Sequence, residues 1–76
     1  MNIILYSTDC PKCKVIEVKL NQLNISYIIE KDIDKINLIA EEHNFSSAPI
    51  LQVNQDFYNF NEAIKWLKEQ SNEYRA

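Results

Sequence analysis

Hydrophobic and polar residues follow two patterns along the chain. Short apolar runs that are flanked by polar or turn-forming residues are typical of β-strands. They lie at residues 3–6, 26–30, 50–53 and 56–58. Elsewhere apolar residues recur every three or four positions, as on one face of an amphipathic helix. The pattern therefore predicts the order strand, helix, strand, helix, strand, strand, helix.

Each predicted helix has a start signal and an apolar face. The first covers residues 12–23, and Pro11 opens it, where a missing N–H is tolerated. Asp32 or Asp34 can cap the second, and Asn59 with Glu62 resembles a capping box for the third. The expected apolar faces are Cys13, Ile16, Leu20 and Leu23 in the first helix, Ile36, Ile39, Ala40 and His43 in the second, and Phe60, Ile64 and Leu67 in the third, with Ala63 and Trp66 beside them. We expect the polar residues after Gln70 to fray.

This order of elements defines an α/β fold. The first strand, helix and second strand form a right-handed parallel unit. The last two strands are separated only by Asn54 and Gln55, so they form an antiparallel hairpin. We expect a four-stranded mixed sheet with helices on both faces. With 76 residues and no linker or repeat, the chain should be one small domain over residues 1–76, and a monomer.

Two cysteines, Cys10 and Cys13, follow the first predicted strand and are the only ones in the chain. A disulfide between positions three apart constrains little of the unfolded chain, so a chemical role is favoured over a structural one. The N-terminus of the following helix offers free N–H groups and a positive partial charge, which favour a thiolate. Lys12 adds a positive charge, whereas Asp9 opposes it. A strand that leads a Cys-x-x-Cys pair into a helix therefore predicts a reactive dithiol.

Composition excludes several other classes. The net charge is −3 and no basic stripe is present, which argues against nucleic-acid binding. No apolar run approaches the roughly 20 residues that cross a bilayer. Residues 1–6 are too short for a signal peptide before the cysteine motif, so we expect a cytoplasmic protein. In the cytosol a close cysteine pair is redox-active or metal-binding more often than structural.

The chain contains no glycine, although about five would be usual at this length. After glycine, asparagine is the residue that adopts positive φ most readily. We therefore expect at least two of Asn24, Asn44 and Asn59 to have positive φ, at helix ends or turns.

The chain resembles the glutaredoxin branch of the thioredoxin superfamily. The matching segments are residues 6–13, which read Tyr-Ser-Thr-Asp-Cys-Pro-Lys-Cys, residues 47–50, which read Ser-Ala-Pro-Ile before a hairpin, and the final helix. The resemblance covers essentially the whole chain and implies a thioredoxin (glutaredoxin-like) fold of order βαβαββα. It implies that Cys10 is the nucleophile and Cys13 the resolving thiol. It also implies a cis Ala48-Pro49 bond facing the dithiol, and the substrate-binding positions are Pro11, Lys12, Ala48 and Pro49.

Members of that branch that use glutathione bind its carboxylates through particular residues, and several of these are missing here. Ser7 stands where relatives carry lysine, and Lys12 where they carry an aromatic residue. Residues 59–62, Asn-Phe-Asn-Glu, stand where relatives carry two glycines and an aspartate. The Thr8-Asp9-Cys10 pattern is more similar to an NrdH-type redoxin. That resemblance implies a dithiol-disulfide oxidoreductase with no bound cofactor, which thioredoxin reductase reduces with NADPH and which passes electrons to ribonucleotide reductase.

Three alternatives remain open at the sequence level. One is a glutathione-dependent glutaredoxin. Another is a dimeric module in which paired Cys10 and Cys13 thiolates hold a metal or an Fe–S cluster between two chains, since one chain alone lacks the ligands for a closed zinc site. The third is an inert packed thiol pair. Among the other residues, His43 is expected to be partly buried, Tyr6 a core aromatic or part of the site, and Trp66 a packing residue.

Overall fold

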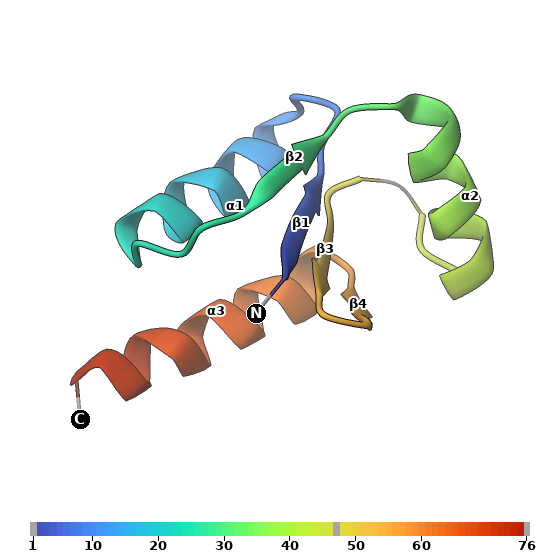
Figure 1. Cartoon of the computed structure of the whole chain (residues 1–76). Coiled ribbons are helices and arrows are strands. Elements are labelled where there is room, and N and C mark those ends of the chain that lie inside the picture. Colours follow the sequence, from blue (N-terminus) through green and yellow to red (C-terminus); the bar gives the residue numbers. More distant parts are fainter. Residues whose placement is uncertain (1, 47, 76) are drawn as a thin grey trace.

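The computed structural model describes residues 2–46 and 48–75, with side chains as far as residue 71 (Figure 1). It contains the predicted helices and strands in the predicted order. They are β1 (Ile3–Tyr6), α1 (Pro11–Gln22), β2 (Ile28–Glu30), α2 (Ile33–His43), β3 (Ile50–Val53), β4 (Asp56–Tyr58) and α3 (Phe60–Arg75). The chain thus has the βαβαββα order that its hydrophobic pattern predicts.

The four strands form one mixed sheet in the order β2-β1-β3-β4. Strand β1 lies at the centre, where Leu5 pairs with Ile29 of the parallel β2 and with Leu51 of the antiparallel β3. Strand β4 pairs with β3 through the predicted two-residue hairpin. Because β1 and β2 are parallel, the loops that follow them emerge at the same edge of the sheet.

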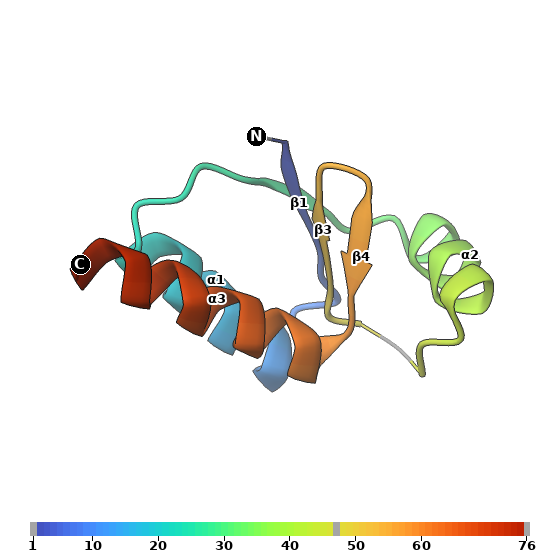
Figure 2. The same cartoon turned by 90° about the horizontal axis from the view of Figure 1, so that it is seen from below.

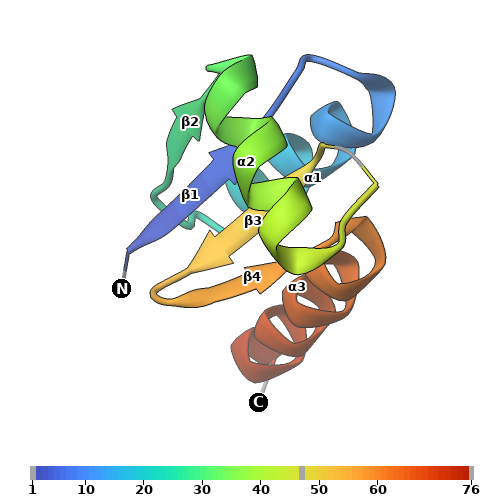
Figure 3. The same cartoon turned by 90° about the vertical axis from the view of Figure 1, so that its right-hand side faces the viewer.

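Helices cover both faces of this sheet (Figures 2 and 3). Helices α1 and α3 lie side by side on one face, and α2 lies on the other. The larger core, between the sheet and the helix pair, consists of Ile3, Leu5, Ile16, Leu20, Leu51, Val53, Ala63 and Leu67. The smaller core, beneath α2, consists of Tyr6, Ile36, Ala40 and Ile50. Strand β1 contributes alternate side chains to the two cores, as a strand covered on both faces must.

Polar side chains define the helix ends largely as predicted. Asp32, rather than Asp34, caps α2 and accepts from the Asp34 and Lys35 amides. The capping box of α3 is present: the Asn59 side chain accepts from the Glu62 amide at 2.9 Å, and the Glu62 carboxylate accepts from the Asn59 amide at 3.1 Å.

Two of the three asparagines chosen for positive φ have it. Asn24 follows α1 with φ of 56°, and Asn44 ends α2 with φ of 57°. The prediction of at least two is therefore confirmed. Asn59 differs because its side chain caps α3, and an N-cap residue has extended backbone angles. Two further residues with positive φ, Asp9 and Asn54, lie in the loop after β1 and in the hairpin.

Two expectations need correction. Strand β2 begins at Ile28, two residues later than predicted. Helix α3 extends to Arg75, and fraying after Gln70 stays a prediction. His43 is exposed, not partly buried, because α2 ends beside the sheet edge. One face of its ring nevertheless stacks on Phe57, with centroids 4.4 Å apart.

Candidate functional site

The cysteine motif occupies the turn from β1 into α1. Strand β1 ends at Tyr6, and residues 7–10 lead to Cys10, which is the N-cap of α1 with extended backbone angles. Pro11 takes the first helical position, as predicted. The Cys10 sulfur accepts a hydrogen bond from the Cys13 amide at 3.2 Å. Cys10 thus fills the role that a serine or aspartate side chain usually has at a helix start, and an amide of the first turn points at its sulfur.

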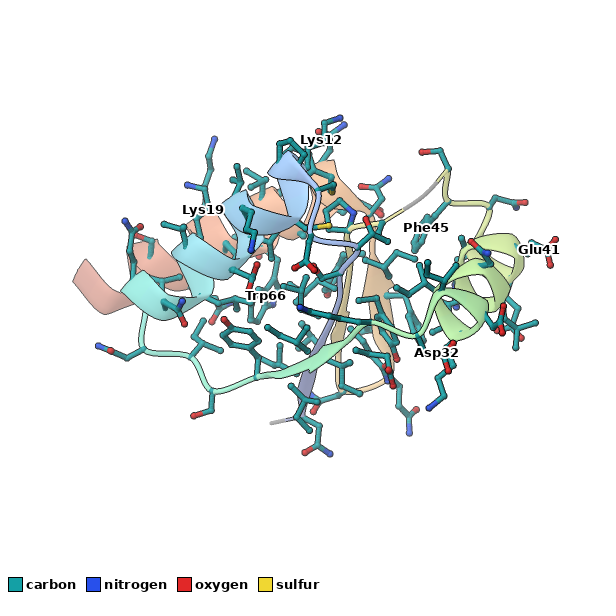
Figure 4. All side chains as sticks on the ribbon, turned by 90° about the horizontal axis from the view of Figure 1, so that it is seen from above. Lys12, Lys19, Asp32, Glu41, Phe45 and Trp66 are labelled. Atoms are coloured by element: carbon teal, nitrogen blue, oxygen red, sulfur yellow. The ribbon has the colours of Figure 1, made fainter. Side chains whose placement is uncertain are left out.

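The two sulfur atoms are adjacent, but they differ in access. Both cysteines are free thiols, and the Cys10 sulfur lies 2.7 Å from the Cys13 sulfur. Cys13 is fully buried on the inner face of α1, whereas Cys10 is half-buried. Figure 4 shows sulfur, in yellow, near the start of α1, where Lys12 is labelled. A disulfide can therefore form between the two with little movement, but only Cys10 is open to a partner.

Cys13 is surrounded by hydrogen-bond donors. Burial by itself would raise the pKa of the Cys13 thiol, but hydrogen bonds from the Cys10 thiol, the Thr8 amide and the Ser7 hydroxyl outweigh it, so the pKa is lowered from its ordinary value. The Thr8 amide lies 3.4 Å from the Cys13 sulfur. Ser7 is fully buried, and its oxygen accepts from the Asp9 amide at 3.1 Å. The loop after β1 thus stabilises a negative charge at the inner sulfur.

Asp9 precedes Cys10 and is paired with two lysines. Its carboxylate lies 3.2 Å from the Lys31 ammonium and 3.7 Å from that of Lys14. The hydrogen bond from Lys31 is the main reason that the pKa of Asp9 is lowered. Sequence reasoning treated Asp9 as an opposing charge beside the thiolate. In the structure the two lysines offset that charge, and Lys31 comes from the loop between β2 and α2.

The expected substrate-binding residues lie around the same turn. The Ala48–Pro49 bond is cis, as the resemblance implies. A cavity of about 170 Å³ brings both residues together with Lys12 and the start of α3. The Lys12 ammonium lies 5.2 Å from the centroid of the Phe60 ring, which is a cation–π distance. Lys12 is therefore exposed to solvent and also held against α3.

A second cavity, which we call the dithiol groove, opens beside Cys10 and has a volume of about 410 Å³. It is lined by Thr8, Cys10, Pro11, Lys12, Ile33, Ile36, Asn37 and Ala48. Sequence reasoning missed the three residues from α2. A signal for them was present, because parallel pairing of β1 and β2 places the starts of α1 and α2 at the same sheet edge.

The remaining candidates lie in the packed structure. Tyr6 is a core aromatic, and its hydroxyl donates to Gln52 at 2.6 Å. Trp66 packs against the larger core, as expected. Within residues 2–46 and 48–75 no group of three or more histidine, cysteine or acidic residues could hold a metal ion. No helix in this part of the chain is long and apolar enough to cross a membrane.

Comparison with known proteins gives matches only at the level of structure. No family model and no curated protein matches the chain. Among solved structures it is similar to the thioredoxin-like protein BC3987, with a TM-score of 0.71 and 22% identity over 91% of this chain and 99% of that one. A point mutant of the same protein gives a TM-score of 0.71 and 22% identity over 92% and 99% of the two chains. The chain therefore adopts a thioredoxin-like fold, with two adjacent cysteine thiols at the start of its first helix.

Proposed function

We propose that the protein is a small dithiol-disulfide oxidoreductase that reduces protein disulfides through Cys10 and Cys13. The observation that carries this proposal is the asymmetry of the pair. The sulfurs lie 2.7 Å apart at a helix N-terminus, yet one is accessible and the other fully buried. This arrangement suits a nucleophile with a resolving thiol behind it.

In the first step the Cys10 thiolate attacks one sulfur of the substrate disulfide. A bond forms between Cys10 and that sulfur, the substrate disulfide breaks, and the second substrate sulfur leaves as a thiolate that takes up a proton. The Cys13 amide, 3.2 Å from the Cys10 sulfur, stabilises the attacking thiolate. Because only Cys10 reaches the surface, it is the sulfur that forms the mixed disulfide.

In the second step Cys13 resolves this mixed disulfide. Its thiol loses a proton and attacks the Cys10 sulfur, and the substrate sulfur leaves as a second thiolate. Cys10 has no proton to donate in the mixed disulfide, so the Thr8 amide, 3.4 Å from the Cys13 sulfur, is the donor that stabilises the Cys13 thiolate in this step. The substrate gains two electrons and two protons, and the protein is left with a Cys10–Cys13 disulfide.

We propose thioredoxin reductase with NADPH, and not glutathione, as the source of electrons. Glutathione carries two carboxylates and needs cationic or N–H anchors near the dithiol. Ser7 is uncharged and fully buried, so it presents no anchor. The Glu62 carboxylate, which accepts from the Asn59 amide at the start of α3, adds a negative charge where an anionic ligand would seek N–H donors. Lys12 remains as the one cation that lines both cavities.

The resemblance to NrdH-type redoxins supports ribonucleotide reductase as an example of the oxidised partner. We place the activity in the cytoplasm, where thiols are kept reduced. In the proposed cycle the protein needs no bound cofactor, since the two sulfurs carry the electrons.

The test compares two ways of reducing the oxidised protein. NADPH with thioredoxin reductase is expected to reduce it faster than millimolar glutathione with glutathione reductase. Efficient turnover with glutathione in a mixed-disulfide assay, and none with thioredoxin reductase, would place the protein among glutathione-dependent glutaredoxins. Failure of both systems, together with no reduction of insulin disulfides by the dithiothreitol-reduced protein, would refute a disulfide reductase altogether.

A further inference from the structure

We propose that Ile33 is a specificity-determining residue, which selects substrates with an apolar side chain next to the disulfide cysteine. This inference rests on the proposed function and adds the class of substrate to it. Ile33 is the first residue of α2, lies in the wall of the dithiol groove, and is 61% exposed. Nothing in the sequence motif around Cys10 pointed to it.

The composition of the dithiol groove favours an apolar occupant. Its apolar surface comes from Ile33, Ile36, Pro11 and Ala48. Among the described residues that line it, Lys12 is the only charged one. Its volume of about 410 Å³ falls within the roughly 300–1,000 Å³ of typical binding clefts. An apolar side chain that enters the groove removes its own surface and that of Ile33 from water.

In the described structure Ile33 contributes neither to the cap of α2 nor to the buried cores. Asp32 already caps α2, so the helix start does not depend on the next residue. The cores beneath the helices include Ile36 and Ala40 but not Ile33. A β-branched residue is also not among the stronger helix formers. Replacement of Ile33 should therefore leave the fold intact.

The chemistry of the proposed reaction determines what occupies the groove. Cys10 lines this same cavity, so the groove offers a substrate disulfide a path to Cys10. The residues that flank the substrate cysteine are then brought against the walls of the groove. Ile33 and Pro11 stand on the two helices that form those walls, α2 and α1. A substrate residue adjacent to the cysteine is thus the one that Ile33 can contact.

The experiment measures reduction of two disulfide peptides that differ only in the residue beside the cysteine, leucine or serine. Dithiothreitol regenerates the protein, so the result does not depend on which reductase serves it. We expect wild-type kcat/KM to favour the leucine peptide, and Ile33→Ser to reduce this preference by roughly 5- to 20-fold. The change should appear mainly in KM. Ile33→Leu should retain the preference.

A matched control is available on the same helix. Leu38 is 59% exposed on α2 but is not among the residues that line the groove. Leu38→Ser should change the preference by about twofold or less. Reduction of hydroxyethyl disulfide, which has no neighbouring side chain, should fall less in Ile33→Ser than reduction of the leucine peptide does. An unchanged preference in Ile33→Ser, or an equal loss with hydroxyethyl disulfide, would overturn the role of Ile33. If the wild type reduces no disulfide at all, the proposed function itself fails.

Discussion

The Cys10 sulfur lies 2.7 Å from the Cys13 sulfur, yet the protein buries Cys13 completely and leaves Cys10 half-exposed. The Cys13 amide donates to the Cys10 sulfur, and donors around Cys13 lower its pKa, so hydrogen bonds favour negative charge at both sulfurs. In the proposed reaction, the accessible Cys10 forms the mixed disulfide with the substrate, and the buried Cys13 then resolves it.

The first prediction assigns the roles of the two cysteines. At neutral pH, iodoacetamide should modify Cys10 before Cys13, because Cys13 has no exposed surface. Cys10→Ser should abolish disulfide reduction, and Cys13→Ser should accumulate a mixed disulfide with the substrate. Mass spectrometry of the alkylated and trapped species gives the measurement. Faster alkylation of Cys13 across a pH series would reverse the assignment.

The second prediction concerns Ser7, which helps to lower the pKa of Cys13. Ser7→Ala should raise this pKa, slow the second step, and increase the steady-state amount of mixed disulfide near pH 7. Quenched-flow trapping of the intermediate measures the effect. Raising the pH should restore the wild-type rate of resolution, because the thiolate then forms without the hydroxyl. A defect that stays constant with pH would indicate a loss of packing instead.

The same shift gives a stability prediction. A thiol whose pKa is lowered by folding stabilises the native state above its ordinary pKa of 9.0, and this contribution disappears as the pH falls through the lowered value. The free energy of unfolding of the reduced wild type should therefore exceed that of Ser7→Ala by more at about pH 9 than at about pH 6. Urea titrations of both reduced proteins provide the test, and a difference that shrinks with rising pH would contradict it.

The third prediction concerns Asp9, whose carboxylate is shared by Lys14 and Lys31. Asp9→Asn keeps a residue that tolerates positive φ but removes the carboxylate that pairs with Lys31 and one of the two that pair with Lys14, whose other partner is Glu17. Alkylation of Cys10 should become roughly two- to fivefold faster at low salt, and the gain should diminish at high salt because the charges are exposed. Asp56→Asn, on β4, makes the same change in net charge and should have no effect. Equal acceleration by both variants would point to net charge alone.

The fourth prediction concerns two roles of asparagine, one through its backbone conformation and one through its side chain. Asn24 and Asn44 have positive φ, so Asn24→Gly and Asn44→Gly should be neutral or mildly stabilising, and valine at either position should cost about 1 kcal/mol or more. Asn59 acts through its side chain, so Asn59→Ala should cost about 1 kcal/mol and remove the capping box. Chemical denaturation of each variant measures these values. A destabilising Asn24→Gly would show that its side chain matters more than its backbone.

Local signals in the sequence were sufficient for most of the secondary structure. Pro11 at a helix start, the Asn59–Glu62 capping box and the apolar run of β3 each involve residues within one turn or one strand of each other. Such interactions depend little on the rest of the fold, so they were predicted correctly. The predictions that failed concerned the start of β2 and the exposure of His43, which depend on how each segment packs against the sheet.

The candidate site also has a part that the local sequence predicts and a part that depends on the tertiary structure. The sequence by itself determined that Cys10 and Cys13 would share the start of a helix, because their spacing and Pro11 fix that geometry within one turn. Only the tertiary structure decided that Ile33 and Cys10 line the same groove, that Lys31 pairs with Asp9, and that Ser7 is buried. These contacts join segments that meet because β1 and β2 pair in parallel and deliver their following loops to one sheet edge. The predicted parallel pairing indicated which sheet edge these segments share, but the individual contacts join residues far apart in the sequence and so appear only in the folded structure.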